Sequence, residues 1–368
     1  MALPDILIVG GGVVGAACAH ALAGRGVSVE LLDDGTRAGA ATTASAGMLA
    51  PFAGAKHGDP ILTLSVRGRD LYREMVPALR EDTGIDAHLW TGGILYVAFT
   101  QADADRAKAD IGWQRQQGLM TDWLDPEDIR QRAPGISLKA LGALLGAEDG
   151  AVDPIALLEA LRVAASRLGV TVTQGARVES LLRDQDRVTG VVTAAGQKRA
   201  GAVLVAAGCW SGRIAGLPRP LSVEPVRGQM VALDWPQGEP AGVAFTGAGY
   251  VVKRGDEAIV GSTVEYVGYE PSVTEGGVAG LLEAARQIYP ELDGKPVRRK
   301  WAGLRPGTPD GRPIVGRDPV VPGLWYATGH GRTGILLAAV TAEIVADLFT
   351  GEPVEHDLSA VDPGRFWM

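Results

Sequence analysis

Residues 6–15 read Ile6-Leu7-Ile8-Val9-Gly10-Gly11-Gly12-Val13-Val14-Gly15. A short apolar run that ends in glycines is typical of a strand buried on both faces of a parallel sheet. The glycines satisfy the pattern G-x-G-x-x-G, in which the first permits a tight turn, the second lets a pyrophosphate approach the backbone, and the third lets a helix pack closely. This stretch therefore predicts a dinucleotide-binding loop between a strand and a helix.

The next segments complete the unit that such a loop needs. An alanine-rich helical pattern covers 13–23, and a second apolar strand is predicted at 27–32. Asp33 then follows Gly15 by 18 residues, close to the spacing of a carboxylate that binds a ribose hydroxyl. No arginine stands beside this acid in the sequence to receive a 2′-phosphate, which disfavours NADP. Strand, helix and strand together predict the start of a doubly wound α/β domain.

Composition limits the other classes of function. The chain has 368 residues, a net charge of −8 and 5% aromatic residues, so a nucleic-acid groove is not expected. Its two cysteines, Cys18 and Cys209, lack zinc-type spacing, and no metal is indicated. The first apolar run lacks the features of a signal peptide, and no segment reaches about 18 uninterrupted apolar residues. We expect a cytoplasmic protein that does not bind a membrane.

Three glycine-rich segments bear on the choice between NAD and FAD. Residues 35–47 are almost entirely small, so their backbone could lie over a flat ring system, although a flexible surface loop is the alternative interpretation. Residues 203–208 form a buried strand that ends in small residues, and 329–334 precede the last helix. The N–H groups at that helix start would favour negative charge, as on a reduced flavin. Three contacts far apart in the sequence favour the elongated FAD.

The rest of the chain alternates helices with strands, without an internal repeat or a linker between domains. Asp59-Pro60 predicts the start of a helix that ends before Gly84. Further helices are predicted at 102–117, 125–132, 153–165, 274–289 and 334–349. Further strands are predicted at 94–99, 170–173, 178–182, 188–193, 202–207, 229–233, 250–253, 297–302 and 324–328.

Six motifs in order along the chain carry a resemblance to a known family. They are residues 8–15, 44–51, 205–211, 225–230, 301–311 and 329–337. The chain resembles the D-amino-acid oxidase group of FAD amine oxidases and, within it, the glycine oxidases of thiamine biosynthesis. The resemblance implies a Rossmann-like FAD domain of discontinuous segments, 1–84, 151–220 and 300–368. It also implies a smaller antiparallel-sheet domain, 85–150 and 221–299, that roofs the substrate.

The resemblance and the glycine-rich segments together imply a set of FAD contacts. The loop glycines are Gly10, Gly12 and Gly15. The other contacts are Val13, Val14, Asp33, Asp34, Ala41, Thr42, Ala46, Gly47, Met48, Val178, Ala207, Gly208, His330, Gly331, Arg332, Thr333, Gly334, Ile335 and Leu336. Monomeric sarcosine oxidases hold flavin through a cysteine near the Arg305 region, but residues 297–312 contain none. We therefore expect noncovalent FAD, with Cys209 as a small buried residue.

The resemblance also implies that Arg305 and Arg332 meet a substrate carboxylate and that Tyr250 closes the pocket. Arg305 follows a predicted strand and precedes Pro306-Gly307, so we expect its backbone in a turn, with a guanidinium able to grip a carboxylate through two hydrogen bonds. Because Ala248 and Gly249 precede Tyr250, the pocket wall offers no polar side chain at that point.

Each of these residues also has a purely structural interpretation. Arg305 could pair with Asp310 or another local acid, and Arg332 could bind backbone carbonyls. His330 is more often a packed or capping histidine, and Tyr250 could be an ordinary strand aromatic. Trp210 and Trp301 are expected in the core, because large rings are usually buried.

These features predict oxidation of a small amino acid such as glycine, sarcosine or a small D-amino acid. A hydride would pass from the substrate Cα to flavin N5, the imine would hydrolyse, and O2 would give H2O2, with thiamine thiazole synthesis as one destination. No side chain is a certain catalytic acid or base. A dehydrogenase with another electron acceptor, and a noncatalytic FAD-binding module, stay open as alternatives, as does a homo-oligomer.

Overall fold

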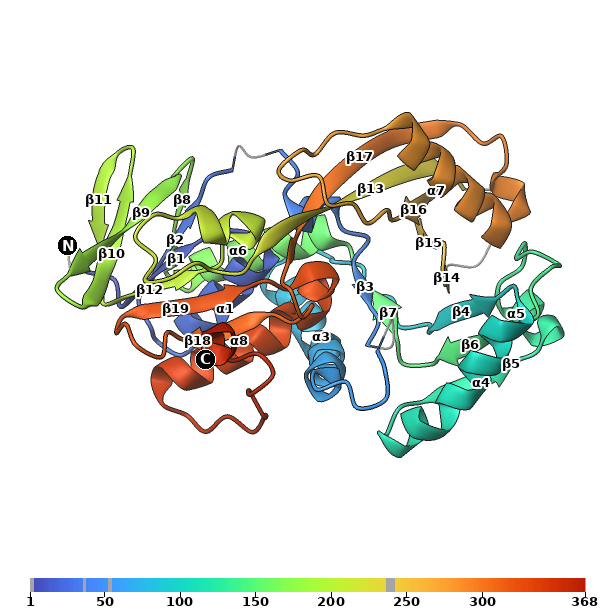
Figure 1. Cartoon of the computed structure of the whole chain (residues 1–368), viewed down its shortest axis with the longest axis horizontal. Coiled ribbons are helices and arrows are strands. Elements are labelled where there is room, and N and C mark those ends of the chain that lie inside the picture. Colours follow the sequence, from blue (N-terminus) through green and yellow to red (C-terminus); the bar gives the residue numbers. More distant parts are fainter. Residues whose placement is uncertain (1–2, 36–37, 52–54, 236–241, 368) are drawn as a thin grey trace.

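The computed structural model describes residues 3–35, 38–51, 55–235 and 242–367. Its larger half, with both termini, is built on a six-stranded sheet (Figure 1). The strands in spatial order are β18 (Ile314–Arg317), β19 (Leu324–Thr328), β12 (Ala202–Val205), β1 (Ile6–Val9), β2 (Val29–Asp33) and β8 (Thr171–Gln174). All pair in parallel except β18, which is antiparallel to β19.

Both faces of this sheet are covered, which is why β1 reads as an unbroken apolar run. Ile6 and Ile8 belong to the core under four helices, whereas Leu7 and Val9 belong to the core on the opposite face. The helices are α1 (Val13–Gly24), α3 (Leu62–Thr83), α6 (Pro154–Arg167) and α8 (Gly334–Thr350). The opposite face carries β9 (Val178–Asp184), β10 (Arg187–Thr193) and β11 (Gly196–Arg199).

The second half contains an eight-stranded sheet that extends away from the first half in Figure 1. The strands in spatial order are β17 (Val297–Gly307), β13 (Glu224–Asp234), β16 (Glu257–Gly261), β15 (Gly249–Arg254), β14 (Val243–Thr246), β4 (Ile94–Ala98), β6 (Gly142–Gly146) and β5 (Thr121–Leu124). Every pair is antiparallel except β14 with β4.

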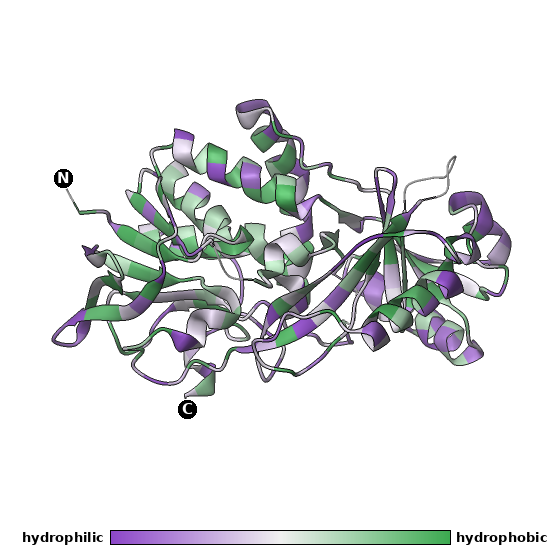
Figure 2. Cartoon of the chain, turned by 90° about the horizontal axis from the view of Figure 1, so that it is seen from above, coloured by the Kyte–Doolittle hydropathy of each residue, from purple (hydrophilic) through white to green (hydrophobic). Residues whose placement is uncertain are grey.

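The two faces of the second sheet have different neighbours. Val251 packs into a core with α5 (Pro126–Arg132) and α7 (Glu275–Ile288). Its neighbours Tyr250 and Val252 lie on the other face, in a cluster with Ala46 and Ala50 from the first half. Figure 2 shows apolar residues along many of the strands of both sheets, and α4 (Gln101–Gln116) is largely polar, with only Ala104 and Gln114 buried. The alternation of side chains along β15 thus turns Tyr250 toward the other half of the molecule.

Short elements connect these layers. They are α2 (Ala41–Ala44), β3 (Met48–Leu49), β7 (Gly150–Ala151) and the 3-10 turns η1 (Gly208–Arg213), η2 (Pro290–Leu292), η3 (Gly331–Thr333) and η4 (Pro363–Phe366). The predicted fold class, a Rossmann-like domain with an added sheet domain, is confirmed. The predicted domain bounds stay a prediction; the one at 300 falls inside β17.

Three predicted element bounds differ from the structure by three residues or more, and one of them is the start of the strand predicted at 229–233, since β13 begins at Glu224. The helix expected from Asp59-Pro60 begins at Leu62, because the Asp59 carboxylate accepts a hydrogen bond from Ile61 N (3.1 Å) and holds a turn before the helix. The strand expected at 297–302 continues to Gly307, so Arg305 lies in β17, opposite Val226, and not in a turn. Pro306 is tolerated there because β17 is an edge strand.

Within the described residues, one helical stretch, Gly331–Thr350, is long and apolar enough to cross a membrane. Most of this stretch is buried, and its α8 part belongs to the core that also contains α1 and α3. A core helix of this kind passes the same test of length and composition as a membrane span. The apolar character of α8 is therefore explained by its packing.

Candidate active site

A cavity of about 1540 Å³ lies between the two halves of the molecule. Val9, Asp33, Ala206 and Thr328, at or just beyond the carboxyl ends of β1, β2, β12 and β19, line one side of it. In doubly wound sheets ligands bind at this edge, where the strand order changes direction. All the residues predicted to bind FAD or substrate line the cavity, with the exception of Gly15. The structure thus brings together segments that are up to about 300 residues apart.

The glycine-rich loop has the geometry that the motif requires. Gly10 has φ of +111°, a conformation that residues with side chains rarely adopt. A Cβ on Gly15 would lie 1.9 Å from Gly10 O, so Gly15 allows close packing of α1 and does not face the cavity. A Cβ on Gly12 would lie 3.2 Å from Thr42 Oγ1, which also accepts a hydrogen bond from Val13 N (3.1 Å). The loop and α2 are therefore held together at the cavity wall.

Asp33 has an arginine partner that its sequence neighbourhood does not contain. Arg162, from α6, forms an ion pair with the Asp33 carboxylate, and its Nε donates to Gly11 O (3.2 Å). The expectation that no arginine lies beside this acid is therefore wrong, because α6 packs against the loop from elsewhere in the chain. Since the Arg162 guanidinium already contacts Asp33 and Gly11, it holds the acid against the loop.

The segment before α8 contributes two side chains of different character. His330 is 2% exposed, and its Nε2 lies 3.0 Å from Thr341 Oγ1. Burial lowers the pKa of His330 to about 3, so the ring is neutral and is a packed histidine at the cavity edge. Arg332 is exposed in the cavity and makes no hydrogen bond or ion pair with any residue that the structure describes. Its predicted alternative role, binding backbone carbonyls, is not found in the described part of the chain.

Arg305 projects from β17 into the opposite side of the cavity. Its Nη2 donates to Ser262 Oγ (2.5 Å) and its Nη1 to Thr263 O (3.1 Å). Burial lowers the pKa of Arg305, but a guanidinium stays charged at neutral pH. Asp310, the alternative partner, is instead paired with Arg365 (2.9 Å). Among the described residues Arg305 therefore has no acidic partner, and its charge is available to an anionic ligand.

Tyr250 forms the apolar part of the same wall. It is 8% exposed, it stacks on Phe245 with ring centroids 6.2 Å apart, and its hydroxyl donates to Met230 Sδ (3.3 Å). Burial raises the pKa of its hydroxyl, so Tyr250 is neutral. Ser262 supplies a polar group to the wall here, although the sequence before Tyr250 indicated none.

Sequence reasoning missed several residues of this site. Arg162, Met230, Phe245 and Ser262 line the cavity, and nothing in their local patterns separates them from ordinary strand or helix residues. Trp210 was expected in the core but is half-buried and lines the cavity, because η1, in which it lies, follows the end of β12 at the cavity edge.

Of the other residues predicted to be buried, Cys209 is fully buried and Trp301 is partly buried. The Nε1 of Trp301 donates to Ala44 O (3.2 Å). Cys18 is also fully buried, and neither cysteine lines the cavity. Burial raises the pKa of the Cys18 thiol to about 12, so this cysteine is unreactive.

Comparison with known proteins settles the family. The family described as FAD dependent oxidoreductase matches residues 5–348. The chain belongs to this family. It is 37% identical to the bifunctional protein ThiO/ThiG of Nostoc sp., over 96% of this chain and 54% of that protein. It is 34% identical to the glycine oxidase of Geobacillus kaustophilus, over 96% of this chain and 95% of that protein.

Solved structures give the same result for this FAD dependent oxidoreductase. The crystal structure of the glycine oxidase from Geobacillus kaustophilus has a TM-score of 0.94 at 32% identity and covers 99% of both chains. That of iminodiacetate oxidase from Chelativorans sp. has a TM-score of 0.90 at 26% identity and covers 97% of this chain and 98% of the other. The chain spans about half the length of the first ThiO/ThiG relatives that it matches.

FAD is the cofactor of this family, and the cavity fits it. The backbone of Gly10 to Gly12 lines the cavity without side chains, and Gly208 lines it with open space at its Cα. The start of α8, preceded by η3, also lines the cavity, and the first N–H groups of a helix have no partner within it. The lining therefore offers separate contacts for the pyrophosphate, the ribose and the flavin.

Proposed function

We propose that the chain is an FAD-dependent oxidase of small α-amino acids, with glycine, sarcosine and small D-amino acids as substrates. The observation that carries this proposal is Arg305, a half-buried cation on the cavity wall without an acidic partner among the described residues. A guanidinium in this state is suited to a carboxylate, which it can bind through two parallel hydrogen bonds. Relatives named glycine oxidase, matched over nearly the full chain, support the same substrate class.

The side chains of the cavity would position the substrate. Arg305 binds the carboxylate, with Arg332 as a second cation nearby, and this fixes the direction in which the substrate Cα points. Tyr250, Phe245 and Met230 form an apolar wall that excludes water from the reacting atoms. When bound, FAD supplies the electron acceptor for a hydride from the substrate Cα. His330 is neutral and packed against Thr341, so it contributes no charge to substrate binding.

The remaining site assignments are part of the proposal. The FAD-binding residues are those predicted from the sequence, with Gly15 acting through packing only. FAD is held noncovalently, since neither cysteine of the chain reaches the cavity lining. The domain division is 1–84, 151–220 and 300–368 for FAD and 85–150 and 221–299 for the substrate. The acceptor is O2, which gives H2O2, and the imine product serves thiamine thiazole synthesis.

We also propose that the protein works in the cytoplasm, without nucleic acid or membrane as partner. The net charge of −8 opposes binding to a polyanion. The one apolar helix of sufficient length in the described chain is explained by its place in the core.

Steady-state turnover on a panel of small amino acids tests the proposal, with H2O2 formation and dye reduction read in parallel. An oxidase gives H2O2 at a rate that matches substrate consumption. Dye reduction without H2O2 would replace O2 by another acceptor and leave the substrate class intact. Absence of both signals for every amino acid, in protein that contains FAD, would contradict the proposed function.

A further inference from the structure

Of the motif at 225–230, only Met230 has a role in the function described so far. The motif lies on β13, beside β17, with Val226 opposite Arg305 and Gly228 opposite Gly303. A Cβ on Gly228 would lie 2.2 Å from Arg305 Nη2 and 2.4 Å from its Cζ. The Arg305 guanidinium therefore lies directly on the bare Cα of Gly228, which only glycine permits.

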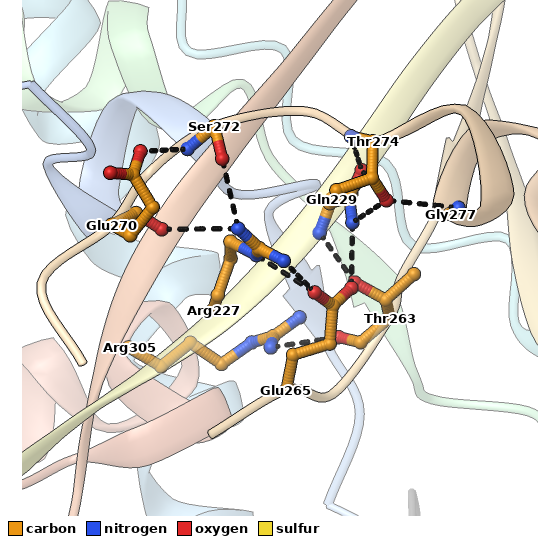
Figure 3. A network of polar contacts seen from close by, with 9 residues as sticks. All are labelled: Arg227, Gln229, Thr263, Glu265, Glu270, Ser272, Thr274, Gly277 and Arg305. Atoms are coloured by element: carbon orange, nitrogen blue, oxygen red, sulfur yellow. Dashed lines mark hydrogen bonds and ion pairs between the residues drawn. The ribbon is translucent and has the colours of Figure 1, made fainter. Parts of the chain in front are cut away.

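The next residue of the motif, Arg227, holds an acid that lies near Arg305. Arg227 is 5% exposed, and its Nε donates to Glu265 Oε2 (2.8 Å). The two backbones are also bridged, from Arg227 N to Glu265 O (2.9 Å) and from Glu265 N to Arg227 O (3.0 Å). Figure 3 shows the Glu265 carboxylate turned toward Arg227, with Arg305 on its other side.

Gln229 forms a hydrogen bond with the second oxygen of the Glu265 carboxylate. Its Nε2 donates to Glu265 Oε1 (2.7 Å), and its own Oε1 accepts from Thr274 N (2.7 Å) at the start of α7. Its backbone N donates to Thr263 Oγ1 (2.9 Å). Both oxygens of Glu265 are thus engaged by β13, and residues 263–265 are fixed against that strand.

The same short segment supplies the partners of Arg305. Ser262 Oγ and Thr263 O accept its two hydrogen bonds, and the charge of Glu265 is close enough to stabilise its cationic form. Glu265 is the acid that could pair with Arg305 if it were released. Such a pair would occupy the guanidinium with an internal carboxylate in place of the ligand.

We propose that Arg227 is a positioning residue that sequesters the Glu265 carboxylate and thereby keeps Arg305 available for the substrate carboxylate. This inference rests on the proposed function, in which Arg305 binds that group. Gly228 and Gln229 serve the same arrangement, the first by leaving room for the guanidinium and the second by holding the other oxygen of Glu265. The motif at 225–230 is in this way part of the substrate site although Arg227 faces away from it.

The test is a rescue experiment in the FAD-loaded enzyme. Arg227→Met frees Glu265 to compete for Arg305, so KM for glycine and the dissociation constant of acetate, read from the flavin absorbance, should each rise about tenfold or more, since hydrogen bonds to charged groups are strong. The maximal rate should change much less. The double variant Arg227→Met with Glu265→Gln removes the competing charge and should restore both constants to within about threefold of wild type.

A matched control comes from the neighbouring strand. Arg299 in β17 forms an ion pair with Glu257 (2.6 Å) that does not line the cavity. Arg299→Met should leave the dissociation constant of acetate unchanged. Adding Glu257→Gln to that variant should leave it unchanged as well. The FAD content and the thermal midpoint of each variant show whether it is folded.

Three outcomes overturn the inference. The first is an Arg227→Met enzyme that binds acetate as the wild type does. The second is a double variant that binds acetate as weakly as the single one, since a merely structural network would not be repaired by a second change. If Arg227→Met does not fold, Glu265→Gln alone decides: acetate affinity equal to wild type or tighter supports the inference, and weaker affinity contradicts it. Failure of the proposed function is seen separately, as acetate binding that is unaffected by Arg305→Ala.

Discussion

At the scale of single residues, the two prongs of the Arg305 guanidinium are the feature on which the site depends. Arg305→Lys keeps the charge but loses the planar geometry, and it also loses the paired bonds to Ser262 and Thr263. The rate of flavin reduction by glycine should fall about 100-fold, while the affinity for acetate falls less, because orientation affects rate more strongly than charge attraction does. Rapid-mixing kinetics and an acetate titration measure the two effects.

Arg305→Ala provides the complementary result. KM for glycine should rise sharply, with the flavin spectrum of the resting enzyme nearly unchanged. Slow turnover of an amine without a carboxylate should be indifferent to this substitution. Equal losses for the amino acid and the amine, with FAD retained, would assign Arg305 to the flavin or the fold and make Arg332 the leading candidate for the carboxylate.

His330 makes a pH prediction with a definite sign. Its pKa is about 3 in the folded protein, lowered by burial from 6.5. The unfolded chain therefore binds an extra proton between these values, so stability is complete above pH 6.5 and is lost as the pH falls toward 3. His330→Asn removes this dependence. The difference in unfolding free energy between wild type and variant should shrink by on the order of 3 kcal/mol from pH 7 to pH 4.

Urea titrations of the two proteins at several pH values measure this difference, and acids elsewhere cancel in the comparison. A constant difference across the range would mean that His330 is charged in the fold and that its burial is compensated by a partner.

Sequence reasoning at this scale succeeded where a residue's chemistry is tied to its motif. The motifs pointed to Gly10, Asp33, Tyr250 and Arg305, and all four line the cavity. Gly15 was named in the same way but does not line the cavity, because it serves the close packing of α1. Arg162 was missed because the contact with Asp33 joins residues 129 positions apart. Only the packing of α6 on the loop creates it.

At the scale of elements, the glycines of the loop between β1 and α1 have different roles. Gly15 allows close packing of the helix, whereas Gly12 lines the cavity. A Cβ at Gly15 would overlap Gly10 O at 1.9 Å, whereas one at Gly12 approaches only Thr42 Oγ1, at 3.2 Å. Gly15→Ala should therefore lower the thermal midpoint of the protein even without FAD. Gly12→Ala should weaken FAD binding with a smaller effect on the apoprotein, because Gly12 faces the cavity.

Fluorescence titration with FAD and thermal unfolding of the apoprotein distinguish the two variants. If Gly12→Ala bound FAD as tightly as wild type, the loop would not carry the pyrophosphate. If Gly15→Ala unfolded at the wild-type temperature, α1 would be able to shift away from β1.

Elements with a strong local pattern were predicted closely. β1 and β19 have the predicted bounds, and α8 differs by one residue at its end. β17 was cut short because Gly303, Pro306 and Gly307 read as a turn, although pairing with β13 along its whole length keeps them extended. β5 and β6 were missed since each is only four or five residues long, and they are defined by pairing, β6 with β4 and β5 with β6.

At the scale of the whole molecule, the cavity lies between two halves, each with its own core, that meet in a smaller cluster around Tyr250. Both cysteines are fully buried and lie outside the cavity lining. Acid precipitation of the purified yellow protein should therefore release free FAD into the supernatant. Flavin that stays with the precipitated chain would contradict noncovalent binding.

The resemblance of six separated motifs indicated this whole-molecule arrangement, but not its details. Which strand faces which helix depends on pairings such as Tyr250 with Gly261, which no local pattern specifies. The parallel pairing of β14 with β4, inside an otherwise antiparallel sheet, is likewise not specified by a local sequence pattern. The half that roofs the substrate was accordingly predicted as a sheet, without its strand order.

Anaerobic reduction of the bound flavin tests the central claim most directly, because it does not depend on the electron acceptor. The enzyme is mixed without oxygen with glycine, sarcosine or a small D-amino acid, and in parallel with methylamine, which is glycine without its carboxylate. We expect the visible absorbance of the oxidised flavin to bleach rapidly with at least one of the amino acids and slowly or not at all with methylamine. In Arg305→Ala, the same amino acid should bleach it much more slowly. A flavin that stays oxidised with every amino acid, or that methylamine reduces as fast as glycine, would contradict the account.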